Sequence, residues 1–304
     1  MASPPTTTGE IQFDVPAAGK PCKTWYKTIG DIHSSTPLIT LHGGPGAGHD
    51  YFLPFEDLVK NHNIPVIFYD QLGCGKSTHL REKVNDVEFW TVDLFIDELE
   101  NLIDHLGIRS GFYLYGQSWG GMMGAVYAAR QPSGLKKLIL ASTPASMPLF
   151  SEATSYLLSQ LPKDVRDVLD ECEREGDHES EKWENACMEF YKRWICRMDP
   201  WPEALLEGFG NLKEDPTVYL TMQGASEFEC TGSLKEWEGY SEAHKINVQT
   251  LLLNGRYDEM RDPVVQPWFD EIPKVKWVTL EKSAHMGHWE ERERYFDIIS
   301  SFLL

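Results

Sequence analysis

The 304-residue sequence has no apolar run that approaches the roughly 18 residues of a membrane-spanning helix. Its first residues, MASPPTTTGEIQFDVP, lack the basic and apolar regions of a secretory signal peptide. The final SFLL resembles no retention or peroxisomal signal. We therefore expect a cytoplasmic protein that has no membrane partner.

Cysteine pairs with a recognisable purpose are also missing. The chain has six cysteines, but no two form a CxxC pair, and no Cys/His cluster has zinc-finger spacing. In a chain without a signal peptide, reduced thiols are the default. The sequence thus predicts neither a disulfide framework nor a metal site.

Basic residues are too few for a nucleic-acid partner. The chain carries 28 Lys and Arg against 47 Asp and Glu, which gives a net charge of −19. A nucleic-acid-binding protein needs a basic face, so this class of partner is excluded. Most of the acidic side chains are expected to be solvated, and a minority could favour a cationic substrate.

The hydrophobic pattern alternates between strand and helix signals. After a hairpin over 11–28, short apolar runs enter turns, and amphipathic or small-residue segments lie between them. This alternation predicts a mostly parallel sheet with helices on both faces. The predicted strands are 37–42, 65–70, 111–116, 136–142, 250–255 and 275–280, and the predicted helices are 51–60, 93–106, 120–130, 264–269 and 290–304.

The alternation stops between about Pro144 and Glu238. Three helical periods replace it there, at 152–161, 165–175 and 182–194. We interpret this stretch as a helical cap inserted into one α/β domain, with the core at 1–143 and 239–304 and the cap at 144–238. Four of its tryptophans are expected mainly in the cap core, with an apolar substrate pocket as the alternative: Trp183, Trp194, Trp201 and Trp237.

The strongest catalytic signal is GQSWG at 116–120, a G-x-S-x-G nucleophile elbow. A predicted strand precedes it and a small-residue helix follows it, as this motif requires. The flanking glycines permit the tight turn that exposes the hydroxyl of Ser118. A serine in a glycine-rich turn is the alternative, but the context favours a nucleophile, which needs a base.

A second glycine-rich turn, LHGGPGAGHDY at 41–51, follows the first predicted strand of the parallel sheet. In α/β-hydrolases such a turn provides one backbone N–H to the oxyanion hole, and the residue after the nucleophile, here Trp119, provides another. Gly44 is the expected donor, with Gly43 as the alternative. Neither this turn nor GCGKS at 73–77 has the spacing of a phosphate loop, so nucleotide binding is not expected.

The histidine of an α/β-hydrolase triad comes last along the chain. Two histidines, His285 and His288, follow the last predicted strand. We favour His285 as the base because it lies in the loop directly after that strand, whereas His288 begins the closing helix and is expected to cap or pack there.

The triad acid should precede the histidine and follow the strand predicted at 250–255. The candidates in this loop are Asp258, Glu259 and Asp262. Asp258 is favoured, since it lies three residues beyond the strand, and its role is to orient the imidazole and stabilise the imidazolium.

With these motifs, the sequence resembles the proline iminopeptidase family of α/β-hydrolases, especially the tricorn-interacting aminopeptidase and the related L-amino acid amidases. HGGPG together with GQSWGG is specific among α/β-hydrolases. The resemblance implies a helical cap over the site, removal of an N-terminal residue, and no metal or organic cofactor. The matching stretches are LHGGPGAGHDY, VIFYDQLGCGKS, YGQSWGG, MQGASEFECTGSLKEW, LLNGRYDE and AHMGHWEERERY.

The resemblance also implies a role for two glutamates. In this family, carboxylates hold the free α-amino group of the substrate, and the matching positions are Glu227 and Glu259. Charge-assisted hydrogen bonds would let such a site distinguish an ammonium group from an internal amide. Two departures limit what the resemblance implies: Ala225 replaces the usual proline, and Met260-Arg261-Asp262 replaces a commoner small residue and Thr or Ser. The cap sets the pocket, and its sequence leaves the accepted side chain open.

These features predict a serine hydrolase that releases proline or another apolar N-terminal residue from a small peptide or amino acid amide through an acyl-enzyme. The alternative is an esterase, thioesterase or lactonase of a biosynthetic pathway with the same triad. The Glu227 and Glu259 pair separates the two, because a neutral acyl group gives it nothing to bind. A catalytically silent binding protein is disfavoured, since a binder need not keep triad and oxyanion turn together. The composition is compatible with a monomer or small homo-oligomer.

Overall fold

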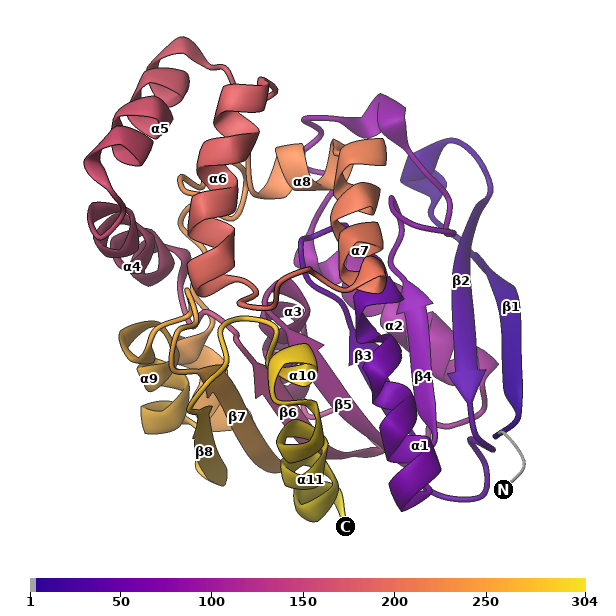
Figure 1. The fold of residues 1–304 in the computed structure, drawn as a ribbon. Helices are drawn as coiled ribbons and strands as arrows, with labels where there is room; N and C mark the ends of the chain where they lie inside the picture. Colours follow the sequence, from indigo (N-terminus) through magenta and orange to yellow (C-terminus); the bar gives the residue numbers. More distant parts are fainter. Residues whose placement is uncertain (1–3) are drawn as a thin grey trace.

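The chain folds around one eight-stranded sheet, seen in a computed structural model that describes residues 4–304 (Figure 1). The strand order is β1-β2-β4-β3-β5-β6-β7-β8. The β1–β2 and β2–β4 pairs are antiparallel, and the others are parallel. The strands are β1 (Thr6–Phe13), β2 (Cys22–Ile29), β3 (Leu38–Leu41), β4 (Val66–Asp70), β5 (Phe112–Gln117), β6 (Leu135–Ala141), β7 (Gln249–Gly255) and β8 (Val275–Leu280).

The central strands are apolar on both faces because helices cover both faces. Successive side chains of a strand point to opposite sides, and alternate residues accordingly join two separate cores. Ile39, Leu114 and Leu140 join one core, whereas Tyr115 and Ile139 join the other. Continuous apolar runs of this kind are what a doubly covered parallel sheet requires.

Five helices make the two covering layers. Figure 1 shows α1 and α11 on the near face of the sheet and α2, α3 and α9 behind it. Their bounds are α1 (Glu56–His62), α2 (Val92–His105), α3 (Trp119–Ala129), α9 (Asp262–Glu271) and α11 (Arg292–Leu303), with the short α10 (Gly287–Glu290) before the last.

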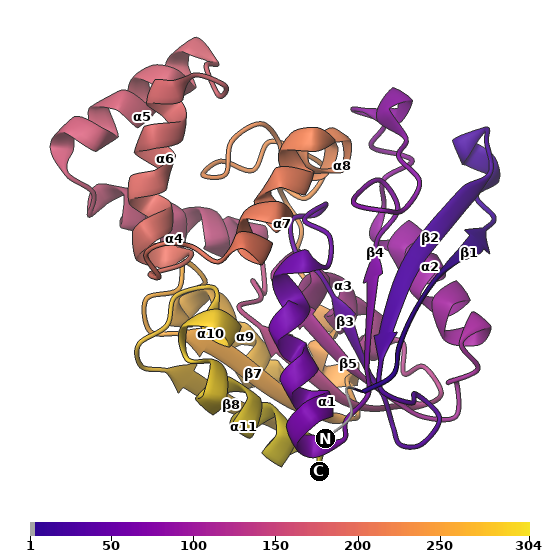
Figure 2. The same ribbon diagram turned by 45° about the vertical axis from the view of Figure 1, so that its right-hand side comes forward.

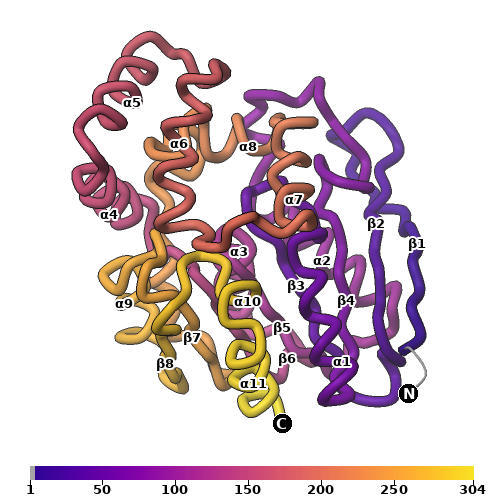
Figure 3. Tube along the Cα trace, in the orientation of Figure 1, coloured from indigo at the N-terminus to yellow at the C-terminus, as the bar shows by residue number. Residues whose placement is uncertain are grey.

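The inserted region is helical, as predicted, and covers the carboxyl ends of the parallel strands (Figure 2). The chain enters it after β6 and returns to the sheet at β7, a path that Figure 3 follows. Its helices are α4 (Met147–Ser159), α5 (Lys163–Glu175), α6 (Glu181–Trp194), α7 (Glu203–Glu214) and α8 (Thr217–Met222).

The cap has its own small apolar core. Trp183 packs edge-on against Phe228, which packs against Phe190. Trp194 lies against the same cluster. Trp201, which packs on Phe209, and Trp237, which packs on Trp268 of α9, instead lie against the two cores of the sheet. The predicted place in the cap core was therefore wrong for these two tryptophans.

Two local predictions were wrong. The segment predicted as one helix over 51–60 begins as a 3-10 helix, Asp50–Phe55, and becomes α-helical only at Glu56. Pro54 lies at the junction and cannot donate a backbone hydrogen bond, which disfavours a continuous α-helix. The cap contains α7 and α8 in addition to the three helices predicted.

No helix within residues 4–304 is long and apolar enough to cross a membrane.

Candidate active site

The elbow holds Ser118 in a backbone conformation that few side chains adopt. Ser118 lies between β5 and α3 with φ 54° and ψ −123°, and conformations of this kind cost energy that the surrounding packing must supply. A Cβ atom at Gly116 would lie 2.3 Å from the carbonyl oxygen of Gly120, and a Cβ at Gly120 would lie 2.1 Å from the carbonyl oxygen of Leu41. The flanking glycines are thus required by close backbone contacts. Ser118 is half-exposed, whereas the residues on either side of it are buried.

The structure brings the predicted acid and base together. Nδ1 of His285 lies 2.8 Å from Oδ1 of Asp258. The hydroxyl of Ser142 donates to Oδ2 of Asp258 at 2.5 Å, and the backbone N–H of Met260 donates to Oδ1 at 2.9 Å. Both members of the pair are buried. The carboxylate is therefore fixed from behind and can hold the imidazole in one orientation.

Ser118 and His285 line the same pocket. Gln117, next to the serine, donates from Nε2 to the backbone carbonyl of His285 at 2.7 Å and ties the histidine loop to the elbow. No hydrogen bond joins the side chains of Ser118 and His285 among the described residues, and such bonds often tighten only when a substrate is bound.

Three carboxylates surround His285 and change its pKa. Burial disfavours the charged imidazolium, but the negative charges of Asp258, Glu259 and Glu227 outweigh this effect and raise the pKa of His285 to about 9. The imidazolium in turn favours the ionised forms of Glu227 and Glu259, and with Asp258 as the largest of the three charges, His285 of the unliganded site favours the form that holds its proton. A group that acts as a base must lose that proton first.

The glycine-rich turn after β3 places Gly44 at the same pocket as Ser118. Gly44 has φ 111° and lines the pocket in front of Ser118. The N–H of Gly43 donates to the hydroxyl of Tyr51 at 2.7 Å and is thereby occupied. Trp119 is the first residue of α3, so its N–H has no acceptor within the helix. This arrangement favours Gly44 over Gly43 as the partner of Trp119 in the oxyanion hole that we propose.

Glu259 lies at the pocket with an unpartnered oxygen. Only 3% of its surface is exposed, and its Oε2 has no hydrogen-bond partner among the described residues. Its Oε1 lies 3.8 Å from Nδ1 of His285. Burial, with the neighbouring charges of Glu227 and Asp258, raises the pKa of Glu259 well above its usual range. A carboxylate in this position is poised to receive a cation.

Glu227 reaches the same place from the cap. It follows α8, and its Oε2 accepts a hydrogen bond of 2.7 Å from the hydroxyl of Tyr219. Burial raises the pKa of Glu227 as well. Glu227 and Glu259 come from different elements of the fold, yet both line the cavity at Ser118.

The cavity has two lobes, and both include Ser118, Gly44, Tyr219 and the two glutamates. One lobe, the histidine pocket, is also lined by His285 and by apolar cap residues: Ile195, Leu205, Phe209 and Leu212. The other, the methionine pocket, lacks His285, includes Trp119, and is lined by Met122, Met147, Phe150, Leu234 and Met260.

The less favoured candidates for the base and the acid, His288 and Asp262, do not line either lobe. Nε2 of His288 donates to the backbone carbonyl of Tyr51 at 3.0 Å, and burial lowers the pKa of His288 to about 3. Asp262 begins α9 and accepts a hydrogen bond from Asn254 at 3.2 Å. Both make structural contacts.

The end of α6 connects the cap to the acid and histidine loops. The carbonyl of Trp194 accepts N–H bonds of 3.3 Å from both Glu259 and His285, and the carbonyl of Ile195 accepts one of 3.0 Å from Met286. No sequence signal marks these bonds, because backbone groups make them. The cap is thereby part of the framework that positions the site.

Comparison with known proteins agrees with this arrangement. Residues 36–292 match the alpha/beta hydrolase fold family. A proline iminopeptidase of Saccharolobus solfataricus is 33% identical over 279 residues, which cover 92% of this chain and 88% of the relative. A proline iminopeptidase of Heyndrickxia coagulans is 35% identical over 281 residues, 91% of this chain and 94% of the relative.

The chain belongs to the proline iminopeptidase family of α/β hydrolases. Two solved structures are similar over nearly their whole length. The crystal structure of VinJ has a TM-score of 0.94 at 42% identity and covers 99% of each chain. That of a proline iminopeptidase from Mycobacterium smegmatis has a TM-score of 0.85 at 38% identity, with 93% of this chain and 94% of that chain covered. This chain is therefore a proline iminopeptidase-like hydrolase.

Proposed function

We propose that the protein is a serine hydrolase that cleaves the bond after a free N-terminal residue, through an acyl-enzyme on Ser118. The observation that carries this proposal is the pairing of Glu227 with Glu259. Two carboxylates lie beside the elbow of Ser118: Glu259, which is buried and has an unpartnered oxygen, and Glu227, which is partly buried. The α-ammonium group of a substrate would supply the charge-assisted hydrogen bonds that these carboxylates lack.

The proposed reaction uses both ring nitrogens of His285, with Nδ1 held by Asp258 and Nε2 free for proton transfer. Ser118 Oγ attacks the carbonyl carbon of the scissile bond while His285 takes the hydroxyl proton, and Asp258 stabilises the resulting imidazolium. The N–H groups of Gly44 and Trp119 bind the oxyanion of the tetrahedral intermediate. His285 then gives the proton to the leaving group. The leaving group departs as its bond to the carbonyl carbon breaks, and the acyl group stays on Ser118. Water then attacks the acyl-enzyme with His285 as the base, the ester bond to Ser118 breaks, and the free N-terminal residue is released.

The two lobes of the cavity determine how we expect the substrate to be oriented. The leaving group must meet His285, so it belongs in the histidine pocket. The acyl side chain then extends into the methionine pocket, away from the base. Met122, Met147 and Phe150 supply a flexible, apolar surface there. We therefore expect proline or another apolar residue as the acyl group, released from a small peptide or an amino acid amide.

Bound ammonium would also activate the base. Its positive charge offsets the carboxylates that raise the pKa of His285, and the imidazole would then lose its proton near neutral pH. A substrate with a blocked amine would leave His285 protonated. Amine recognition and base activation would in this way be one event.

A panel of aminoacyl anilides and simple esters, each with and without N-acetylation, tests the proposal. Free-amine anilides of apolar residues should give the highest kcat/KM, and N-acetylation should reduce it by roughly ten- to a hundredfold, the equivalent of a lost charged hydrogen bond. A preference for N-blocked esters would instead indicate an esterase, thioesterase or lactonase with the same triad.

A further inference from the structure

Helix α7 of the cap lies directly on the glycine-rich turn that holds Gly44. A Cβ atom at Gly46 would lie 3.3 Å from Cδ2 of Leu212, and one at Gly208 would lie 3.3 Å from Cδ1 of Tyr51. Tyr51 is the residue whose hydroxyl binds the N–H of Gly43. The cap thus contacts the turn that carries the proposed oxyanion donor.

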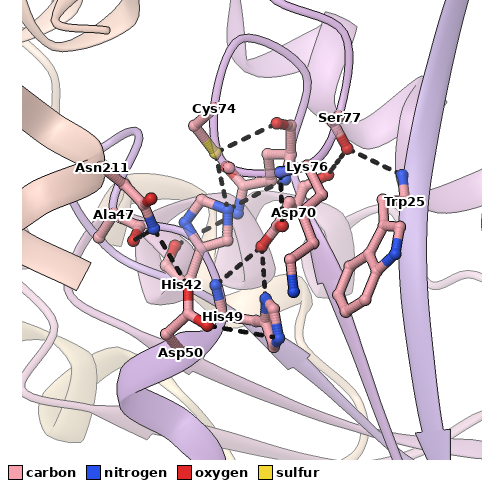
Figure 4. A network of polar contacts seen from close by, with 12 residues as sticks. Trp25, His42, Ala47, His49, Asp50, Asp70, Cys74, Lys76, Ser77 and Asn211 are labelled. Atoms are coloured by element: carbon pink, nitrogen blue, oxygen red, sulfur yellow. Dashed lines mark hydrogen bonds and ion pairs between the residues drawn. The ribbon is translucent and has the colours of Figure 1, made fainter. Parts of the chain in front are cut away.

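One polar side chain of α7 bonds to this turn. Asn211 donates from Nδ2 to the backbone carbonyl of Ala47 at 2.9 Å and to Oδ2 of Asp50 at 3.2 Å (Figure 4). The N–H of Ala47 donates in turn to the carbonyl of Gly43 at 3.2 Å, which closes the turn around Gly44. Both backbone polar groups of Ala47 are engaged, one by the turn and one by the cap.

The core holds the far end of the turn through a buried aspartate. Oδ1 of Asp70 accepts from both the backbone N–H and Nδ1 of His49, each at 2.8 Å. Its Oδ2 accepts from the N–H of Lys76 at 2.9 Å. Figure 4 shows this network between Asn211 on one side and the loop of Lys76 on the other.

The loop of Lys76 returns to α7 and closes the circuit. Nδ1 of His79 lies 2.5 Å from Oδ2 of Asp215, the residue that directly follows α7, and Nε2 of His79 donates to the carbonyl of Gly75 at 2.9 Å. Asp215 N–H donates to the carbonyl of Asn211 at 3.1 Å. Hence α7 is anchored to the core at its end and touches the oxyanion turn along its side.

From this circuit we infer that Asn211 is a positioning residue for the oxyanion hole: its bond to the Ala47 carbonyl holds the turn so that the N–H of Gly44 points at the reacting oxygen. The inference rests on the proposed function. Its consequence is that the oxyanion hole is complete only while the cap is seated, although no cap residue donates to the oxyanion itself.

Asn211→Leu is the sharpest test, because it nearly keeps the size of the side chain, removes the donor and places no negative charge against Asp50. The loss should fall on the transition state, with kcat lower by about ten- to a hundredfold, less than the roughly hundred- to thousandfold loss of an entire oxyanion donor. KM should stay within about twofold. The affinity for an aminoacyl aldehyde, whose adduct with Ser118 carries the oxyanion, should fall by the same factor as kcat.

The matched control is Lys213→Ala, on the same helix with a side chain that is 71% exposed. It should leave kcat and aldehyde affinity unchanged. Affinity for the free amino acid product, which needs no oxyanion hole, should be unchanged in both variants. A purely structural role for Asn211 would lower thermal stability without the matched loss of kcat and aldehyde affinity, and that result would overturn the inference.

The two proposals fail in different ways. If wild-type protein turns over a substrate and Ser118→Ala does not, unchanged kcat and aldehyde affinity in Asn211→Leu would remove only the positioning role. Wild-type protein that neither turns over the panel nor binds the aldehyde would remove the proposed function, and the positioning role with it.

Discussion

Replacing Glu259 with glutamine should affect the two classes of substrate in opposite directions. Glu259 lies 3.8 Å from Nδ1 of His285 and is one of the three carboxylates that raise the pKa of that histidine. Glutamine keeps the size of the side chain and removes the charge that the ionised carboxylate carries next to the imidazolium. The substitution should therefore weaken the binding of an ammonium group. It should also lower the pKa of His285, so that the imidazole can act as a base at lower pH.

The size of each effect follows from the site. With a pKa of about 9, only about 1% of His285 is neutral at pH 7. Loss of one neighbouring charge should lower this pKa by about one unit, which raises the neutral fraction to about 10%. Hydrolysis of N-acetylated esters at pH 7 should then rise by up to about tenfold. The gain should vanish above about pH 10, where His285 has lost its proton in both wild-type and Glu259→Gln protein.

Free-amine substrates should lose instead. Their ammonium already offsets the carboxylates, so they gain nothing from a lower histidine pKa. They lose one hydrogen bond between charged groups, about 1.5–3 kcal/mol, or roughly ten- to a hundredfold in kcat/KM.

The assay is kcat/KM against pH for one free-amine anilide and one N-acetylated ester, in wild-type and Glu259→Gln protein. Glu229→Gln is the matched control, since Glu229 is an exposed acid beside Glu227. Equal losses on both substrates would contradict the amine-binding role of Glu259. An ester profile with the same apparent pKa in both proteins would contradict its effect on His285.

Two further substitutions test the framework of the site. Ser142→Ala removes the hydrogen bond to Oδ2 of Asp258, and kcat should fall by about tenfold with little change in KM; an unchanged kcat in steady-state kinetics would show that the other bonds to the carboxylate suffice. Gly120→Ala would press a Cβ atom against the carbonyl oxygen of Leu41, and thermal denaturation should show that the free energy of unfolding falls by about 1–3 kcal/mol or more. Gly210→Ala, which meets no atom within 4 Å, should be neutral or stabilising. Equal stability of the two variants would refute this account of the elbow.

Much of the fold could be predicted because its signals are local. The parallel strands are short apolar runs between turns, and the elbow has its own spacing. Helix α7 gave a weaker signal, since Gly208 and Gly210 lie within it and glycine lowers helix propensity. Its packing on the turn of Gly46 stabilises it in the folded protein, and that contact is remote in sequence.

The candidate site divides in the same way. Chain order and strand ends were enough to propose Ser118, Asp258 and His285, because the fold brings the ends of parallel strands to one edge. Ser142 and Asn211 could not be found in this manner. Each acts through a hydrogen bond to a residue more than a hundred positions away, and neither belongs to a motif. Glu227 was predicted only through the family resemblance, because no pattern of charge in the sequence distinguishes it from the other acidic residues.

The most direct test of the central proposal is the intact mass of the protein during turnover. Wild-type protein is mixed with an apolar aminoacyl anilide or with its N-acetyl counterpart, quenched in acid within the first turnovers, and weighed by mass spectrometry. The predicted result is a gain of one aminoacyl group, mapped to Ser118, with the free-amine substrate, a far smaller gain with the acetylated one, and none in Ser118→Ala. Turnover by wild-type protein without a covalent species on Ser118 at any quench time, or equal acylation by both substrates, would contradict it.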